Sequence, residues 1–124
     1  MNNKLKTIIV EDDMVARMIL ENYCKNHPDI ELLKDFDDVE NAREYISREK
    51  VDLVLLDIQL KDGSGFDLLK YLPTSTQVIV TTGSSSNIKE AQALGLDNCL
   101  LKPITLQDFL LSIKKLKPIA QEII

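Results

Sequence analysis

Acidic side chains follow two of the short apolar runs in this sequence. Glu11, Asp12 and Asp13 come directly after the first run, and Asp57 ends the most apolar one. Carboxylates that crowd together raise one another's pKa unless a counter-charge relieves them. A hard cation such as Mg²⁺ can do this, and it is usually held by one or two carboxylates, water and phosphate oxygens. If the fold brings these acids together, they would form a metal-assisted phosphate site.

A hydroxyl group and an ammonium group follow two further apolar runs. Thr82 lies just past the run at 77–80, and Lys102 lies just past the run at 99–101. A lysine point charge and a threonine hydroxyl can bind the phosphoryl oxygens that a cation leaves free. Because Asp57 ends a run typical of a buried strand, a rigid element would back its carboxylate, which could act as a nucleophile toward phosphorus.

The elements that must position these groups are short strands and amphipathic helices in alternation. Brief, branched or apolar runs predict strands at 6–10, 30–36 (polar enough for an edge strand), 51–56, 77–80 and 99–101. Apolar residues three or four positions apart predict helices that begin near 16, 39, 66, 88 and 106. This alternation indicates parallel strands joined by right-handed crossovers, with helices on both faces. Ligands bind at the carboxyl ends of the strands in such sheets, so the groups above should meet at one rim.

Two helix ends carry their own signals. Thr105, with Asp108 three residues later, is close to a capping box and predicts the start of the last helix. Gly95 predicts the C-terminal cap of the helix before it. Residues 117–124 either extend the last helix past its proline or begin a connection to another segment.

Composition places the chain among single globular domains. It has 124 residues, of which 44% are hydrophobic, and only four glycines and four prolines, which exclude disorder and Gly/Pro-biased structure. A net charge of −5 argues against direct binding of nucleic acid or an anionic membrane. No apolar stretch is long enough to span a bilayer, and the first residues, MNNKLKT, lack the apolar stretch of a signal peptide. Two distant cysteines indicate reduced thiols in a cytoplasmic protein, and one histidine excludes a multi-histidine metal site.

Four motifs in chain order resemble the receiver domain of response regulators in two-component signalling. They are IIVEDD near the start, VLLD followed by DGSG, VTTG, and LLKP. The resemblance covers residues 5–116, and the runs DIQLKDGSGFDLL and LLKPI are similar to receivers of LytTR-type regulators. It implies a flavodoxin-like α/β fold, a five-stranded parallel sheet of order 2-1-3-4-5 with five helices. We expect residues 1–124 to be a single receiver domain, with 117–124 as a tail or the start of a linker.

The resemblance implies a role for each acidic residue of the site. Asp57 matches the phospho-accepting aspartate. Glu11 and Asp12 match the acidic pair that binds Mg²⁺, with Asp12 as a direct ligand and Glu11 acting through water. Asp13 is then an extra acid at the start of a helix. Gln59, two residues past the acceptor, would lend its backbone carbonyl to the metal.

The resemblance also assigns the switch residues. Thr82 matches the hydroxyl that responds to phosphorylation, and Lys102 matches the lysine that contacts the phosphate. Three positions depart from the usual pattern, with Lys61 in place of proline, Gly83 in place of alanine and Cys99 in place of an aromatic residue. Because the aromatic ring is missing, we expect Thr82 and Gly83 to transmit the signal through the backbone, with Cys99 as passive packing.

A receiver is a signalling domain rather than a metabolic enzyme. The resemblance implies that it takes a phosphoryl group from a histidine kinase or a phosphotransfer protein and promotes its own dephosphorylation. Its output would be a changed surface around the fourth helix, fifth strand and fifth helix. That surface would act on an output protein, on a DNA-binding domain later in the chain, or in a phosphorylation-dependent homodimer.

Other roles for these residues are less consistent with the pattern. TTGSSSN is similar to the phosphate-binding loop of flavodoxins, but their loop follows the first strand, which here ends in acids. Phosphatases of the haloacid dehalogenase type need a DxDx-T motif, which is missing. Acids after a strand can also merely cap a helix, and Lys102 taken alone could be a solvated surface lysine.

Overall fold

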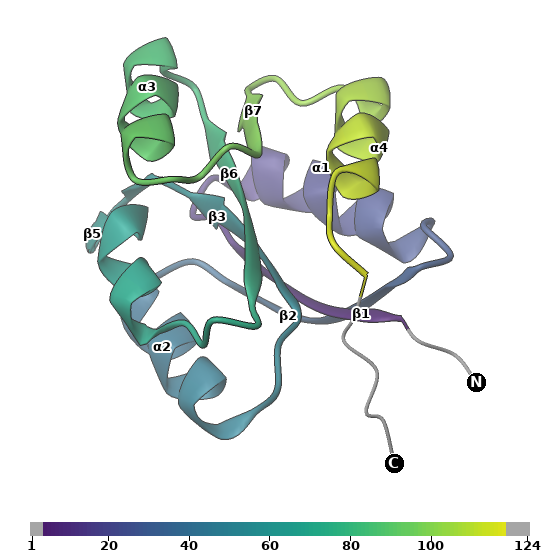
Figure 1. Cartoon of the computed structure of the whole chain (residues 1–124), viewed down its shortest axis with the longest axis horizontal. Coiled ribbons are helices and arrows are strands. Elements are labelled where there is room, and N and C mark those ends of the chain that lie inside the picture. Colours follow the sequence, from purple (N-terminus) through teal and green to yellow (C-terminus); the bar gives the residue numbers. More distant parts are fainter. Residues whose placement is uncertain (1–3, 119–124) are drawn as a thin grey trace.

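Five parallel strands form the central sheet, which a computed structural model describes over residues 4–118. They are β1 (Leu5–Val10), β2 (Ile30–Phe36), β3 (Leu53–Asp57), β6 (Gln77–Thr82) and β7 (Cys99–Leu101). Their spatial order is β2-β1-β3-β6-β7, so β2 is an edge strand as predicted (Figure 1). Counted among the parallel strands alone this is 2-1-3-4-5, which confirms the flavodoxin-like topology.

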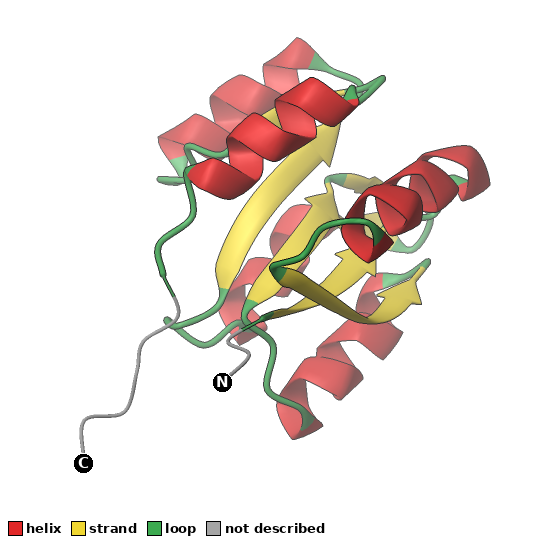
Figure 2. Cartoon of the chain, turned by 90° about the vertical axis from the view of Figure 1, so that its right-hand side faces the viewer, coloured by secondary structure: helices red, strands yellow, loops and turns green. Residues whose placement is uncertain are grey.

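Helices cover both faces of the sheet (Figure 2). They are α1 (Met14–Lys25), α2 (Val39–Arg48), the 3-10 helix η1 (Gly65–Tyr71), α3 (Ser85–Ala93) and α4 (Leu106–Lys114). Helices α1 and α4 pack on one face, where Leu20 and Phe109 join the core. Helices α2, η1 and α3 pack on the other face through Ala42, Leu68 and Ala91. Between residues 4 and 118, none of these helices is long and apolar enough to cross a membrane.

Strand β3 is the middle strand and is buried on both sides, because its sequence is apolar almost without interruption. Leu53 and Leu55 enter the core beneath α1 and α4, while Val54 and Leu56 enter the opposite core. The strand ends at Asp57, only 3% of which is exposed. This carboxylate is therefore presented by a middle strand whose residues are all buried.

The predicted helix ends are confirmed. Thr105 caps α4, because its side chain accepts a hydrogen bond from the backbone N–H of Asp108 at 3.1 Å. Helix α3 ends at Ala93, and Gly95 follows with a φ of 84°, a conformation that favours glycine just past a helix. The last helix ends at Lys114, so it is not extended to 118, while a connection over 119–124 lies outside the described residues.

Two details of the predicted helices are wrong. Leu94, Leu106 and Leu110 belong to the apolar residues whose spacing predicts the last two helices, yet these side chains are 58%, 50% and 39% exposed. The periodic stripe marks the side of a helix but not how far the neighbouring elements extend over it. The third helix is a 3-10 helix. It is preceded by a hairpin of β4 (Gln59–Leu60) and β5 (Gly63–Ser64), which the sequence does not predict because each strand has only two residues.

Candidate functional site

The carboxyl ends of four parallel strands form the predicted rim. The register pairs Val10 with Leu56, and Asp57 with Thr81, so the ends of β1, β3 and β6 lie side by side. Strand β7 joins them through the pairing of its last residue, Leu101, with the end of β6. The residues that follow β1 and β7, and those that end β3 and β6, therefore meet at one edge.

Three carboxylates gather at this rim. Ligand atoms of Glu11, Asp12 and Asp57 all lie within 4.8 Å of one another. Glu11 is completely buried, whereas Asp12 is partly exposed and can be reached from solvent. Such a set of hard oxygen donors could hold a metal ion, and Mg²⁺ prefers oxygen donors of this kind.

Lys102 supplies part of the counter-charge that the crowded carboxylates need. Its ammonium group forms an ion pair with Oε1 of Glu11 and lies 3.3 Å from Oδ2 of Asp57. Its side chain is 22% exposed, so the pairing is sheltered from solvent screening. The peptide bond between Lys102 and Pro103 is cis. Lys102 is therefore part of the site, where its ammonium group neutralises part of the negative charge of Glu11 and Asp57.

Burial and these neighbours shift two pKa values. Burial raises the pKa of Glu11 to about 7, and its contact with Asp57 adds to the rise, while Lys102 and the backbone N–H of Asp13 oppose it. For Lys102, burial lowers the pKa, but the carboxylates of Glu11 and Asp57 outweigh burial and raise it above its ordinary value. Both groups therefore hold their protons more strongly than the free side chains do, and a cation bound at the rim would compete with these protons.

The backbone around Asp57 is held by the loop that follows it. Oδ1 of Asp57 accepts a hydrogen bond from the backbone N–H of Gln59 at 3.2 Å. The N–H of Gly65 donates to the carbonyl oxygen of Ile58 at 2.8 Å, which draws the two segments together. A Cβ atom on Gly65 would lie 2.1 Å from the carbonyl oxygen of Asp57. Gly65 is therefore required by close packing, a role that the DGSG motif alone did not reveal.

The predicted switch hydroxyl is buried at the end of β6. The oxygen of Thr82 accepts hydrogen bonds from the N–H of Ser84 at 3.1 Å and from the side-chain amide of Asn87 at 2.9 Å. Sequence reasoning did not identify Asn87, although it ends the TTGSSSN run that was singled out. Gly83 is exposed, and a Cβ atom there would meet nothing within 4 Å. Its smallness is therefore not demanded by packing.

Other residues near the rim have structural roles. Asp13 caps α1 by accepting from the N–H of Ala16 at 2.9 Å, so the helix-cap interpretation holds for this one acid of the three. Cys99 is half-buried against the core, and its thiol donates to the carbonyl of Leu96 at 3.4 Å. The Oγ1 atom of Thr81 is buried and has no hydrogen-bond partner within residues 4–118.

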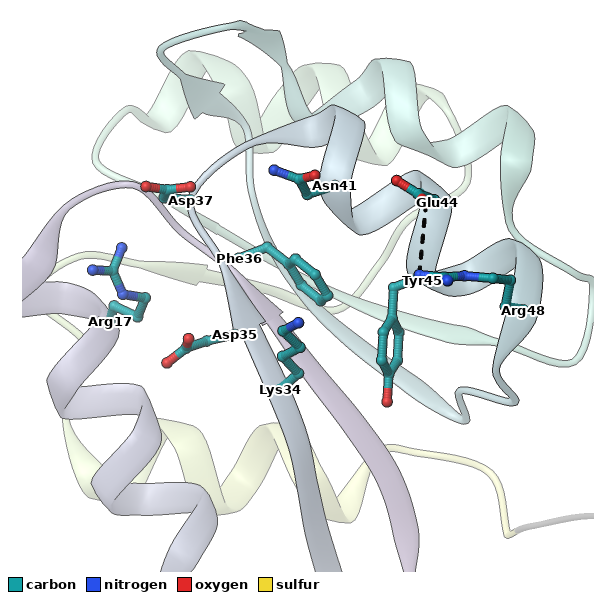
Figure 3. A pocket seen from close by; sticks show the side chains of 9 residues that line it. All are labelled: Arg17, Lys34, Asp35, Phe36, Asp37, Asn41, Glu44, Tyr45 and Arg48. Carbon is teal, nitrogen blue, oxygen red and sulfur yellow. Dashed lines mark ion pairs between the residues drawn. The ribbon is translucent and has the colours of Figure 1, made fainter.

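A separate cavity of about 480 Å³ lies between α1, β2 and α2 (Figure 3). Its lining includes Lys34, Asp35 and Arg48, so charges of both signs face it. None of the rim residues lines it. This cavity is therefore not the site at which the predicted chemistry converges.

The chain matches known proteins over most of its length. Residues 7–114 match the response regulator receiver domain family. The chain is 30% identical over 116 residues to the sensory transduction protein LytT of Bacillus anthracis, a match that covers 91% of this chain and 47% of LytT. It is 31% identical over 110 residues to the transcriptional regulatory protein CitB of Klebsiella pneumoniae, covering 85% of this chain and 47% of CitB. The chain thus spans about half the length of these curated relatives.

Solved structures share the fold. The response regulatory domain of protein mrkE from Klebsiella pneumoniae superposes with a TM-score of 0.81 at 25% identity, covering 90% of this chain and 93% of that one. The signal receiver domain of a putative Luxo repressor protein from Vibrio parahaemolyticus has a TM-score of 0.77 at 27% identity, covering 90% and 88%. The chain belongs to the response regulator receiver domains, and it is a two-component signalling domain rather than a metabolic enzyme.

Proposed function

We propose that Asp57 accepts a phosphoryl group from a phosphohistidine of a partner protein. The observation that carries this proposal is the position of its carboxylate, which is 3% exposed at the end of β3 and within 4.8 Å of the other two acids of the rim. A carboxylate oxygen of Asp57 forms the new O–P bond, the P–N bond to the histidine breaks, and the imidazole leaves. Water later cleaves the O–P bond of the acyl phosphate, which restores the carboxylate and releases inorganic phosphate.

We further propose that Mg²⁺ is the cofactor. Asp12 and Asp57 would hold it directly, Glu11 through water, and Gln59 through its backbone carbonyl. When bound, the cation would neutralise the charge that develops on the phosphoryl oxygens and on the crowded carboxylates. The ammonium group of Lys102 already lies beside Asp57 and is placed to bind a phosphoryl oxygen.

The donor must be a protein that can bring a phosphohistidine to this rim. Helix α1, which follows the acids at the end of β1, carries three exposed apolar side chains. They are Met14, Val15 and Met18, which are 64%, 65% and 60% exposed. A cavity of about 310 Å³ lies beside them, between Val15 of α1 and Pro103. A histidine kinase or phosphotransfer protein could bury this patch while its histidine approaches Asp57, and we propose that it does so in the cytoplasm.

We propose that phosphorylation changes the surface of α3, β7 and α4, with Thr82 and Gly83 carrying the signal and Cys99 remaining passive. Relatives of twice this length include a transcriptional regulatory protein, so a DNA-binding segment later in the native chain is one target. A separate output protein or a phosphorylation-dependent homodimer is another. We also propose that residues 1–124 form one domain, of which the final residues begin a linker.

Intact-mass spectrometry after incubation with acetyl phosphate tests the proposed function. With Mg²⁺ the protein should gain one phosphoryl group, and chelation of the cation should prevent this. Asp57→Asn should abolish the gain, whereas Asp97→Asn, at an exposed aspartate in the loop before β7, should leave it unchanged. Full labelling of Asp57→Asn would show that another residue is the acceptor.

A further inference from the structure

The hydroxyl of the switch residue is tied to α3 in this structure. Thr82 accepts hydrogen bonds from the backbone N–H of Ser84 and the side-chain amide of Asn87, at 3.1 and 2.9 Å. A threonine oxygen has two lone pairs, so these two donors occupy its whole accepting capacity. The Thr82 side chain is completely buried and forms no side-chain hydrogen bond to Asp57 or Lys102. Its orientation is set from the α3 side rather than from the acceptor side.

The side chain of Asn87 makes a hydrogen bond between the start of α3 and the end of β6, where α3 has no side-chain cap. Asp13, Asp38 and Thr105 cap their helices with side-chain hydrogen bonds, but Ser84 at the cap of α3 makes none. The hydroxyl of Ser84 pairs instead with that of Ser86 at 2.7 Å. Among the α3 residues, only Ala91 is buried, so packing holds this helix weakly. The bond from Asn87 to Thr82 therefore joins the first turn of α3 to the end of β6.

We propose that Asn87 is a positioning residue that holds the Thr82 hydroxyl away from the acceptor in the unphosphorylated protein, so that phosphorylation must break this hydrogen bond. The inference rests on the proposed function, because it concerns how the same site switches. The Thr82 O–H would donate to a phosphoryl oxygen on Asp57, and this donation would draw the side-chain oxygen toward the acceptor and away from the amide of Asn87. The released amide and the first turn of α3 would then be free to move together.

The consequence for phosphorylation follows from linkage. A hydrogen bond that exists only in the unphosphorylated state stabilises that state. It therefore weakens the binding of any phosphoryl group or analogue that requires the switched state. A neutral hydrogen bond of ordinary net strength corresponds to about a threefold to tenfold change in an equilibrium constant. Loss of the Asn87 amide should therefore strengthen the adduct by about this factor, whereas general damage to the loop would weaken it.

Titration with beryllofluoride and Mg²⁺ tests the proposal, because beryllofluoride on a carboxylate mimics an acyl phosphate and binds reversibly. Amide NMR signals across residues 82–88 report the adduct. Asn87→Ala should bind beryllofluoride about threefold to tenfold more tightly than the unaltered protein. Ser86→Ala, which removes the other side-chain hydrogen bond in the same turn, is the matched control and should change the affinity by less than about twofold.

Thr82→Val isolates the contact itself. This substitution keeps the shape of the side chain but removes its hydroxyl, so Asn87→Ala added to it should have no further effect on the affinity. An Asn87→Ala variant that binds as the unaltered protein does, or more weakly, would overturn the proposal. So would an enhancement that persists in Thr82→Val. If the unaltered protein forms no adduct at all, the proposed function itself is wrong, an outcome that is distinct from an adduct insensitive to Asn87.

Discussion

The ammonium group of Lys102 lies 3.3 Å from a carboxylate oxygen of Asp57. The same ammonium group is paired with Glu11. A lysine in this position stabilises the crowded acids of the metal-free protein and competes with a cation for them. We propose that it also binds the phosphoryl oxygens once Asp57 is modified.

Replacing this lysine should weaken the metal-free fold. Lys102→Ala leaves two buried carboxylates without their cationic partner, and we expect it to lower the free energy of unfolding by about 1–3 kcal/mol, because the lysine is partly exposed. Mg²⁺ should bind more tightly to this variant, since its competitor is gone. Urea denaturation and calorimetric titration with Mg²⁺ measure the two effects, with the exposed Lys61→Ala as a control. A stable variant with unchanged Mg²⁺ affinity would contradict the pairing.

Adjacent aspartates should respond to alanine in opposite directions. Asp12 adds a third negative charge to the rim, so Asp12→Ala should stabilise the metal-free protein by about 1 kcal/mol and weaken Mg²⁺ binding. Asp13 caps α1, so Asp13→Ala should destabilise the protein by about 0.5–2 kcal/mol and leave Mg²⁺ affinity unchanged. Thermal denaturation with a chelator, followed by Mg²⁺ titration, separates them. Equal destabilisation by both would mean that Asp12 is also structural.

Stability of the metal-free protein should fall as the pH rises. The pKa of Glu11 is about 7 in the folded protein, against an ordinary value of 4.5 that applies to the unfolded chain. Between pH 4.5 and 7 the folded state therefore keeps a proton that the unfolded state has lost. The stabilisation is complete below about pH 4.5 and is lost as the pH passes about 7, an effect of about 2–4 kcal/mol from this group. Denaturation in a chelator at several pH values should show this slope, and Glu11→Gln should remove it. An unchanged slope in Glu11→Gln would assign it to another group.

Two glycines offer a matched test of the acceptor loop. Gly65→Ala places a methyl group against the carbonyl of Asp57, so it should cost more than about 2 kcal/mol of stability and reduce phosphorylation from acetyl phosphate. Gly83→Ala meets no atom and has no positive φ, so its stability should lie within about 1 kcal/mol of the original. Chemical denaturation and phosphorylation assays measure both variants. Normal labelling of Gly65→Ala would show that the loop tolerates displacement.

Sequence reasoning could locate the rim because of a general property of parallel sheets. The polar residues that end apolar runs must meet at one edge once the strands run in the same direction, and the motif order identified the family. It could not show that Lys102 pairs with Glu11, or that Asn87 donates to Thr82, because side-chain rotamers decide those contacts. The hairpin over 59–64 was missed for another reason, since strands of two residues carry no periodic signal.

Mapping the phosphorylated residue tests the central claim most directly. After incubation with acetyl phosphate and Mg²⁺, borohydride reduction converts an acyl phosphate on aspartate to homoserine, which peptide mass spectrometry locates. We predict homoserine at position 57 alone, formed only when Mg²⁺ is present. Conversion at Asp12 or Asp13, or equal conversion at position 57 with the cation chelated, would contradict the account of the site.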